Sequence, residues 1–272
     1  MARPMWTYTL IKKLFPRRPS DAKKLARLPR IQRMFDKWLT EGDNMVCLPN
    51  DKVIAIDEFV DAPENLVLPS QVVDHFINEA SYIWIMNNCI CRDAMQCKDY
   101  PIGIGCLHLG VATKDIHPGL GRHVSKQEAL EHVKRAREAG LIQMVGKTKL
   151  DTVWLKVGPG DKLFTICNCC PCCCVSRVKP YSSERVKANF HCLPGVSVKV
   201  NENCTGCGEC TQGSCFMSAI SLDGDHAVIN DECLGCGRCA EVCPHDAIEF
   251  TVANKNYVKE TIENLSQSVD VR

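Results

Sequence analysis

The sequence has no long hydrophobic run. No stretch approaches the roughly 20 apolar residues that a membrane-spanning helix needs, so we expect no transmembrane segment. The opening residues, MARPMWTYTLIKKLF, lack the apolar core and the small-residue cleavage site of a secretory signal. A phosphate-binding loop, a flavin motif and a proton-transfer constellation are missing too, so no enzyme class is indicated by motif. These absences favour a cytoplasmic protein and leave its function to other features.

Aromatic residues are few and the overall charge is small. Phe, Trp and Tyr make up 6% of the 272 residues, hydrophobic residues 45% and charged residues 24%, with a formal net charge of +1. Such a composition is typical of a globular chain rather than a disordered one. The length is sufficient for two modest domains.

The small net charge hides an uneven distribution. Residues 1–38 hold eleven Lys and Arg but two Asp and Glu. We therefore expect residues 1–42 to form a basic arm, which is either a solvated segment or a docking element. Interleaved apolar residues such as Trp6, Leu10 and Phe15 favour packing against a surface. We expect the arm to dock a redox partner protein; peripheral membrane contact remains open, and no nucleic-acid partner is expected.

Cysteine is the residue type that the sequence has in excess, with twenty among 272 residues. Disulfide-rich proteins are mostly small and secreted, which this chain is not. The cysteines cluster at spacings of two and three residues, and this pattern is typical of metal ligands. The sequence therefore predicts a metal-binding protein of a reducing, anoxic cytoplasm.

The C-terminal third contains an internal repeat. NENCTGCGECTQGSCFMSAI (201–220) aligns with NDECLGCGRCAEVCPHDAI (230–248), and each half reads as strand, cluster loop, short helix and strand. Three thiolates from one tight loop suit three irons of a cubane, and the glycines between them let backbone N–H groups approach the cluster sulfurs. The spacing predicts two iron–sulfur sites.

These two runs resemble the bacterial-type two-[4Fe–4S] ferredoxin, in which the fourth ligand is exchanged between the halves. The resemblance implies two ligand sets: Cys204, Cys207, Cys210 and Cys243 for one cluster, and Cys233, Cys236, Cys239 and Cys215 for the other. The first run departs from the family pattern, because it has one extra residue before Cys215 and Phe216 in place of proline. Structural zinc is the alternative for paired C-x-x-C motifs.

A second group of cysteines lies in CICRDAMQCKDYPIGIGC, at Cys89, Cys91, Cys97 and Cys106. An apolar stripe predicts a helix over residues 69–88 that leads into this group. Arg92 and Lys98 would offset the negative charge of ligating thiolates. We expect an iron–sulfur site of open type here, with zinc or simple buried thiols as alternatives.

The densest run is CNCCPCCC, with Cys167, Cys169, Cys170, Cys172, Cys173 and Cys174. If the chain is extended up to position 170, Cys167 and Cys169 point one way and Cys170 the other. Pro171 should then end the strand. Six thiols therefore cannot serve one cubane from one face, and we expect some of them to join the 89–106 cysteines in one or two further clusters. A redox-active thiol pair near Arg177 and Lys179 is the alternative.

Between these groups, SKQEALEHVKRAREAGL (125–141) predicts a helix. Ser125 and Glu128 form a capping box and Gly140 ends the helix. LIQMV, GKTK and LDTVWLKV (141–157) then predict a hairpin, so that helix and ribbon together resemble part of a winged-helix domain. The helix mixes acidic with basic residues, which argues against a DNA-binding stripe.

Together these features predict an α+β protein with a mostly helical, winged-helix-like N-terminal part. We expect a cysteine-rich metal-binding domain at 43–180, a two-cluster ferredoxin domain at 195–252 and a tail at 253–272. The chain resembles the multi-cysteine proteins of strict anaerobes that carry a C-terminal ferredoxin domain. The expected function is transfer of low-potential electrons to or from a partner oxidoreductase. Two alternatives remain, namely an iron–sulfur reductase that reacts at the N-terminal cysteines and an iron–sulfur redox sensor.

Overall fold

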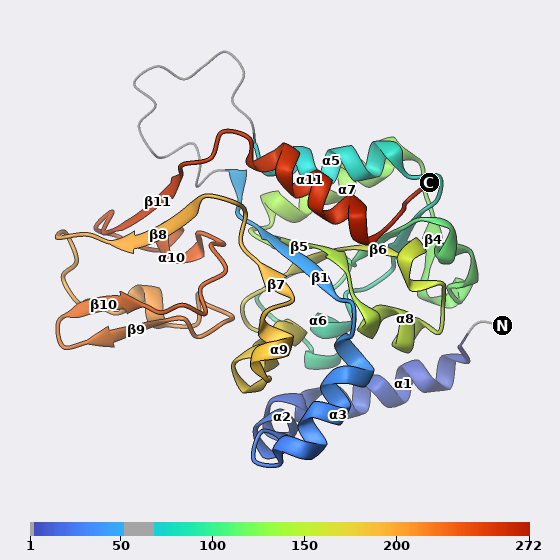
Figure 1. Cartoon of the computed structure of the whole chain (residues 1–272), viewed down its shortest axis with the longest axis horizontal. Coiled ribbons are helices and arrows are strands. Elements are labelled where there is room, and N and C mark those ends of the chain that lie inside the picture. The colour runs from blue at the N-terminus through green and yellow to red at the C-terminus, as the bar shows by residue number, and fades with distance from the viewer. Residues whose placement is uncertain (1–2, 52–67) are drawn as a thin grey trace.

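A mixed seven-stranded sheet forms the centre of the molecule (Figure 1). The computed structural model describes residues 3–51 and 68–272. The strand order is β4-β2-β3-β6-β5-β1-β7, and all neighbours are antiparallel except β1 and β7, which are parallel. The strands are β1 (Asn44–Leu48), β2 (Ile83–Met86), β3 (Leu107–Leu109), β4 (Gly121–His123), β5 (Ile142–Lys147), β6 (Phe164–Cys169) and β7 (Phe190–His191).

Three helices cover one face of this sheet: α5 (Ser70–Glu79), α7 (Lys126–Glu138) and α11 (Tyr257–Ser268). Side chains alternate along each strand, so every strand supplies this face with every second residue. On β6, Phe164 and Ile166 pack with the helices in the main hydrophobic core. Cys167 and Cys169 belong to a second cluster on the opposite face. The alternation therefore directs these two thiols away from the covering helices.

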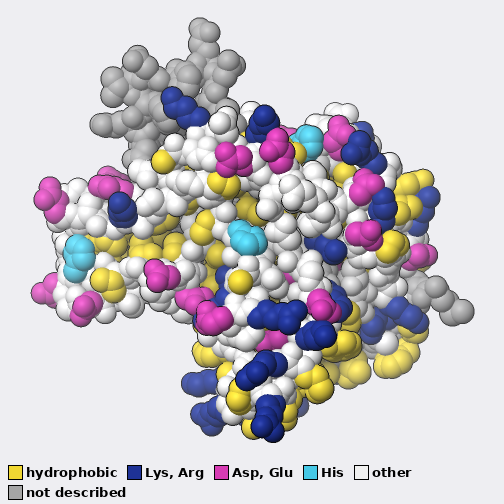
Figure 2. All heavy atoms as spheres, viewed as in Figure 1, with side chains coloured by type: hydrophobic (Ala, Val, Ile, Leu, Met, Phe, Trp, Pro, Cys, Tyr) yellow, Lys and Arg dark blue, Asp and Glu magenta, His cyan; other side chains and the backbone are white. Residues whose placement is uncertain are grey.

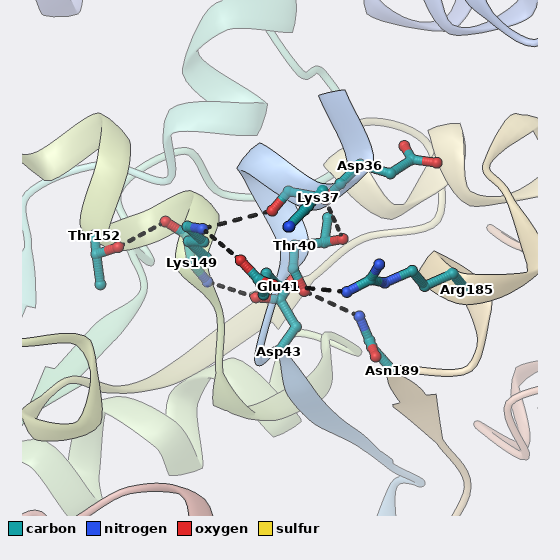
Figure 3. A network of polar contacts seen from close by, with 9 residues as sticks. All are labelled: Asp36, Lys37, Thr40, Glu41, Asp43, Lys149, Thr152, Arg185 and Asn189. Atoms are coloured by element: carbon teal, nitrogen blue, oxygen red, sulfur yellow. Dashed lines mark hydrogen bonds and ion pairs between the residues drawn. The ribbon is translucent and has the colours of Figure 1, made fainter. Parts of the chain in front are cut away.

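The opposite face carries α6 (Ile90–Met95), α8 (Lys149–Leu155) and the three helices of the basic arm (Figure 1). The arm consists of α1 (Met5–Leu14), α2 (Arg18–Leu25) and α3 (Pro29–Thr40), with a 3₁₀ turn at Phe15–Arg17. Other short 3₁₀ segments lie at Val111–Asp115, Pro118–Leu120, Gly160–Lys162 and Val175–Tyr181. Polar contacts join the end of α3 to the body of the protein (Figure 3).

Residues 195–252, the C-terminal unit, lie beside the main sheet (Figure 1). β8 (Val196–Val200) pairs with β11 (Ile248–Val252), and β9 (Ile220–Asp223) pairs with β10 (His226–Ile229), both antiparallel. The cysteine loops, a 3₁₀ turn at Glu209–Thr211 and α10 (Arg238–Glu241) lie between these ribbons, and α9 (Glu184–Lys187) precedes the unit. Residues 253–272, expected to be a tail, return to the main core as α11, where Leu265 is fully buried.

Some local expectations are confirmed. The Ser125 side chain accepts a hydrogen bond from the backbone N–H of Glu128, and α7 ends before Gly140, which has a φ of +71°. β6 ends at Cys169, before Pro171. Residues 43–61 also read as a short strand pair or loop in the sequence. Part of this segment lies outside the described residues, and its described portion contains β1.

The winged-helix expectation is wrong. Residues 149–155 form helix α8 instead of the second strand of a hairpin, and β5 pairs with β1 and β6 inside the large sheet. Leu150, Val153 and Trp154 have helical spacing as well as partial alternation, so the pattern was ambiguous. The helix predicted over 69–88 is also too long, because the chain ends α5 at Glu79 and forms the buried strand β2. No helix in residues 3–51 and 68–272 is long and apolar enough to cross a membrane.

Candidate metal centres

Two cavities in the C-terminal unit are each lined by four cysteines. The first cavity is lined by Cys204, Cys207, Cys210 and Cys243, together with larger side chains that include Leu222, His245 and Ile248. Cys215, Cys233, Cys236 and Cys239 line the second. Each set combines three thiols from one half of the repeat with one thiol from the other half. The fold thus brings together the two groups of four that the ferredoxin resemblance implies.

Backbone N–H groups around these cavities are placed to donate hydrogen bonds to cysteine sulfur. The N–H groups of Ala227 and Ala247 donate to the Sγ atoms of Cys204 and Cys243, each at 3.3 Å. In the second cavity, the Ala219 N–H donates to Cys215 Sγ at 3.3 Å. Such amide donors stabilise negative charge on the sulfurs. The donor set and its surroundings therefore fit a thiolate-ligated cluster in each cavity.

Close packing explains one of the glycines in the first loop. Gly206 has a φ of +68°, and a Cβ there would lie 2.6 Å from the carbonyl oxygen of Asp225. Glycine alone combines this left-handed conformation with so close a backbone contact. The cysteine loop can therefore lie flat against the β9–β10 turn.

A third group of thiols lies in the N-terminal part. The Sγ atoms of Cys97, Cys170, Cys172 and Cys173 all lie within 4.8 Å of one another. We call these the four-thiol group. Cys97 comes from the loop after α6, whereas the other three come from the turn that follows β6. This spacing is suited to one bound metal ion or cluster with four cysteine ligands.

The remaining cysteines of both N-terminal segments form a separate group on the opposite side of that turn. We call Cys89, Cys91, Cys106, Cys167, Cys169 and Cys174 the six-thiol group. Cys106 Sγ lies 3.6 Å from Cys167 Sγ, and Cys174 Sγ lies 3.3 Å from Cys169 Sγ. Cys89 lies within hydrogen-bonding reach of Cys91 and Cys106. The CNCCPCCC run is thus divided between two sites, with Cys170 opposite to Cys167 and Cys169, as strand alternation predicts.

Hydrogen bonds between these thiols favour thiolates at two positions. Donation from Cys106 and Cys91 holds the pKa of the Cys89 thiol well below its usual range. Hydrogen bonding with the neighbouring Cys169 thiol and with Ser176 lowers the pKa of Cys174 to about 7. Thiolates are the form in which cysteine binds metal. Hydrogen bonds to neighbouring thiols, together with burial, raise the pKa values of Cys91, Cys106, Cys167 and Cys169 well above the usual range, so two of the six thiols favour the thiolate form.

A buried guanidinium lies between the two thiol groups. Arg92 has an exposed fraction of 0%, and its side chain donates to the backbone carbonyls of Pro101 and Asn168, at 2.9 and 2.7 Å, and to that of Ile104. No carboxylate forms an ion pair with it among the described residues. A buried cation is costly unless negative charge lies near. The thiol groups of Cys89, Cys170 and Cys106 lie close enough to interact electrostatically with this guanidinium.

A cavity of about 720 Å³ opens above the six-thiol group. All six of these cysteines line it on one side, and apolar side chains of the basic arm, including Ile11, Phe15 and Leu39, line it on the other. The cavity is several times larger than either cavity of the C-terminal unit. Its size lies within the range of about 300–1,000 Å³ of small-molecule sites.

Side-chain contacts connect the C-terminal unit with both N-terminal thiol groups. Arg238, which lies between Cys236 and Cys239, donates to the Tyr100 hydroxyl at 2.5 Å. The Tyr100 ring packs against the four-thiol group. Phe216 and Met217, which follow Cys215, pack in one cluster with Cys169 and Cys174. The second cavity of the C-terminal unit is therefore adjacent to the N-terminal sites.

Two cysteines stand apart from all four groups. Cys47 is fully buried on β1, and burial raises the pKa of its thiol well above the usual range. Cys192 donates to the backbone carbonyl of Cys233 at 3.3 Å. Neither is among the residues that line the thiol cavities.

Arg238 and Tyr100 were not singled out from the sequence, because only the fold brings them together.

One comparison with known proteins returns a match. Residues 211–254 match the family model described as the LdpA Fe-S cluster-binding domain. The matched segment contains Cys215, Cys233, Cys236, Cys239 and Cys243. No curated protein and no solved structure matches the chain. The matched domain and the cysteine groups together indicate an iron–sulfur protein with a redox function.

Proposed function

We propose that this protein transfers single electrons between a donor and a partner oxidoreductase in a reducing, anoxic cytoplasm. The observation that carries the proposal is the pair of four-cysteine cavities in the C-terminal unit, each built from both halves of the repeat. We assign Cys204, Cys207, Cys210 and Cys243 to one [4Fe–4S] cluster and Cys233, Cys236, Cys239 and Cys215 to the other. A bound [4Fe–4S] cluster supplies one-electron chemistry at a potential set by its surroundings.

The protein's own residues would hold and tune these centres. Backbone N–H groups at Ala219, Ala227 and Ala247 donate to ligand sulfurs and favour added negative charge. Arg238 places a positive charge beside the second cavity and contacts Tyr100 at the four-thiol group. We assign a third cluster to the four-thiol group, which gives the electron a further centre next to the second cavity.

A second candidate function is an iron–sulfur reductase that reacts at the six-thiol group. The cavity of about 720 Å³ beside these thiols favours it, because a relay needs no space for a substrate. In this case the C-terminal unit would deliver electrons to the reacting site. The winged-helix face that would favour a regulatory role is absent from residues 3–51 and 68–272.

Anaerobic iron and sulfide analysis, combined with electron paramagnetic resonance (EPR) of the reduced protein, tests the proposal. Two clusters in the C-terminal unit require about eight irons, a third cluster raises the count to about twelve and a fourth to about sixteen. The variants Cys239→Ala and Cys243→Ala should each perturb one cluster, and Cys47→Ala should perturb none. Tightly bound zinc without sulfide would overturn the proposal. A count of about eight irons per chain would mean that the N-terminal cysteines hold no cluster, and this part of the proposal would then fail.

The two candidate functions give different results with small molecules. A relay should show unchanged EPR spectra when an iron ligand such as cyanide is added, since every iron then has a cysteine ligand. A reductase with an accessible iron at the six-thiol group should show a new signal. Cys106→Ala should remove that signal, whereas Cys47→Ala should retain it.

A further inference from the structure

Helix α3 of the basic arm exposes its apolar side instead of burying it. Ile31, Met34 and Trp38 have the i, i+3, i+7 spacing of one helix face, and their exposed fractions lie between 43% and 63%. Phe35, which is 39% exposed, lies beside them and also lines the large cavity. The buried residue of this helix is the polar Gln32, whose amide donates to the Tyr181 carbonyl at 2.9 Å. Ile31, Met34 and Trp38 do not line the large cavity, so this apolar face is available to something outside the chain.

Helix α1 repeats this arrangement. Trp6 and Leu10 are four residues apart and are 67% and 47% exposed, and neither lines the large cavity. Leu14, one turn farther on and 52% exposed, lies at the edge of this stripe and also lines the cavity. The other side of the helix faces the body, where Lys12 forms an ion pair with Asp93 at 2.6 Å and Tyr8 donates to the same carboxylate. Two helices of the arm thus present apolar stripes to solvent.

Basic side chains surround these stripes. The exposed basic residues of the arm are Lys13, Arg17, Lys23, Lys24, Arg27, Arg30, Arg33 and Lys37, and none of them forms a side-chain ion pair with another described residue. Figure 2 shows hydrophobic and basic side chains side by side over the helices at the bottom of the view. The exposed acidic residues of the arm are Asp21 and Glu41, and Glu41 is paired with Lys149 and Arg185 of the body. The surface therefore combines apolar contact area with strong positive charge.

The stripes belong to an anchored structure and not to a fraying end. Asn189 donates to the carbonyl of Thr40 at 3.1 Å, and Asp43 accepts from the Lys149 N–H at 2.6 Å (Figure 3). Glu41 forms ion pairs with Lys149 and Arg185. Farther along the arm, Arg18 donates to the Cys173 carbonyl at 2.6 Å. These contacts hold the helices in an orientation that keeps their apolar stripes outward.

We propose that α1, α2 and α3 dock on the surface of an anionic phospholipid bilayer. An amphipathic helix with aromatic and aliphatic residues on one face and Lys or Arg around it lies in the interface, with its apolar face in the acyl boundary. Trp6 and Trp38 suit the headgroup region, which favours amphipathic rings. Each basic side chain adds attraction to anionic lipids. An acidic protein partner would use the charges but would not need two exposed apolar stripes.

Docking in this way places the bilayer next to the large cavity. Leu14, Phe15 and Phe35 of the docked helices line that cavity, whose opposite wall is the six-thiol group. One layer of helices would therefore separate the lipid surface from the N-terminal cysteines. This arrangement is independent of whether the protein relays electrons or reduces a substrate.

Anaerobic cosedimentation of the full iron-loaded chain with vesicles tests the proposal. Vesicles with about 30 mole per cent phosphatidylserine should retain the protein, whereas pure phosphatidylcholine vesicles should retain far less. The double variant Met34→Ser/Trp38→Ser removes apolar contact, and Lys23→Glu/Lys24→Glu reverses charge. Each should weaken retention by at least about tenfold. Raising the salt concentration should weaken it further.

The matched control is Tyr82→Ser/Val228→Ser. These residues lie outside the arm, line none of the thiol cavities and are also exposed, at 37% and 41%, so their replacement should leave vesicle binding unchanged. An unchanged iron content in every variant shows that the protein is still loaded. Failure to sediment with either vesicle overturns the proposal, as does loss of binding in the control. Retention on polyglutamate without vesicle binding would assign the surface to an acidic protein and would also overturn it.

Discussion

Arg92 Nη1 donates a 2.7 Å hydrogen bond to the backbone carbonyl of Asn168, and this bond joins the two N-terminal cysteine segments. Asn168 lies between Cys167 and Cys169 on β6, and Arg92 follows Cys91 in α6. The same guanidinium binds the carbonyls of Pro101 and Ile104, so it holds the whole 89–106 loop against the end of β6. It also places a positive charge beside Cys89, Cys170 and Cys106. Arg92 is therefore a positioning residue for both thiol groups.

Replacing Arg92 should remove iron from the N-terminal part alone. The variant Arg92→Met loses three hydrogen bonds and the charge that offsets the thiolates, and unpaired buried groups of this kind cost several kcal/mol. We expect the iron count to fall by about four to eight per chain while the EPR signals of the C-terminal clusters remain. Arg122→Met, at an exposed position, is the control. Full iron content in Arg92→Met would contradict this role.

Single cysteine variants should divide the thiols into the groups that the structure shows. Cys172→Ala removes one sulfur of the four-thiol group and should cost about four irons. Cys47→Ala removes a buried thiol that belongs to none of the groups, so the iron count should not change, although a loss of about 1 kcal/mol of stability is expected. Iron and sulfide analysis of the two variants measures the difference. Equal losses in both would refute the grouping.

The contact between Arg238 and Tyr100 should influence the cluster of the second cavity. Arg238→Gln removes a positive charge beside Cys236 and Cys239, which should lower the reduction potential of that cluster by roughly tens of millivolts. Tyr100→Phe removes the hydrogen bond but no charge, so its shift should be smaller. EPR-monitored redox titration resolves the two values. A shift confined to the cluster of Cys204 would show that the assignment of Arg238 is wrong.

Asp43 should make the stability of the protein depend on pH. Burial raises the pKa of Asp43 to about 6, above its ordinary value of 3.8. A raised pKa means that the stabilising contribution is fully present below the unfolded value and is lost as the pH rises through the folded value. Asp43→Asn keeps an oxygen for the Lys149 N–H and should remove this loss. Relative to the variant, the native protein should lose about 1 kcal/mol between pH 5 and pH 7.

Thermal midpoints of the anaerobic protein at pH 5, 6 and 7 measure this difference, which corresponds to about 2–4 °C in a chain of this size. Glu41→Gln, at an exposed position of the same network, should retain the native pH profile. Parallel profiles of the native protein and Asp43→Asn would show that Asp43 has no such effect.

The sequence alone was sufficient to predict iron–sulfur binding in the C-terminal third, where residues 211–254 match a cluster-binding domain. The repeated C-x-x-C-x-x-C spacing and the trailing cysteines Cys215 and Cys243 are local features, because one short loop supplies three thiols at once. Helix α7 was equally predictable, since its capping box and terminal glycine act within a few residues. The secondary structure of short apolar segments such as 83–86 and 150–155 could not be predicted, because helix and strand periodicities overlap over so few residues.

Only the tertiary structure decided how the N-terminal cysteines are grouped. Alternation and Pro171 showed that CNCCPCCC had to divide, but the partners of each thiol depend on which loop the sheet brings to the end of β6. The same holds for the Arg238–Tyr100 contact and for the outward apolar stripes of the arm. Local spacing is a property of the chain, whereas proximity between distant segments depends on how helices and strands pack to bury their apolar faces.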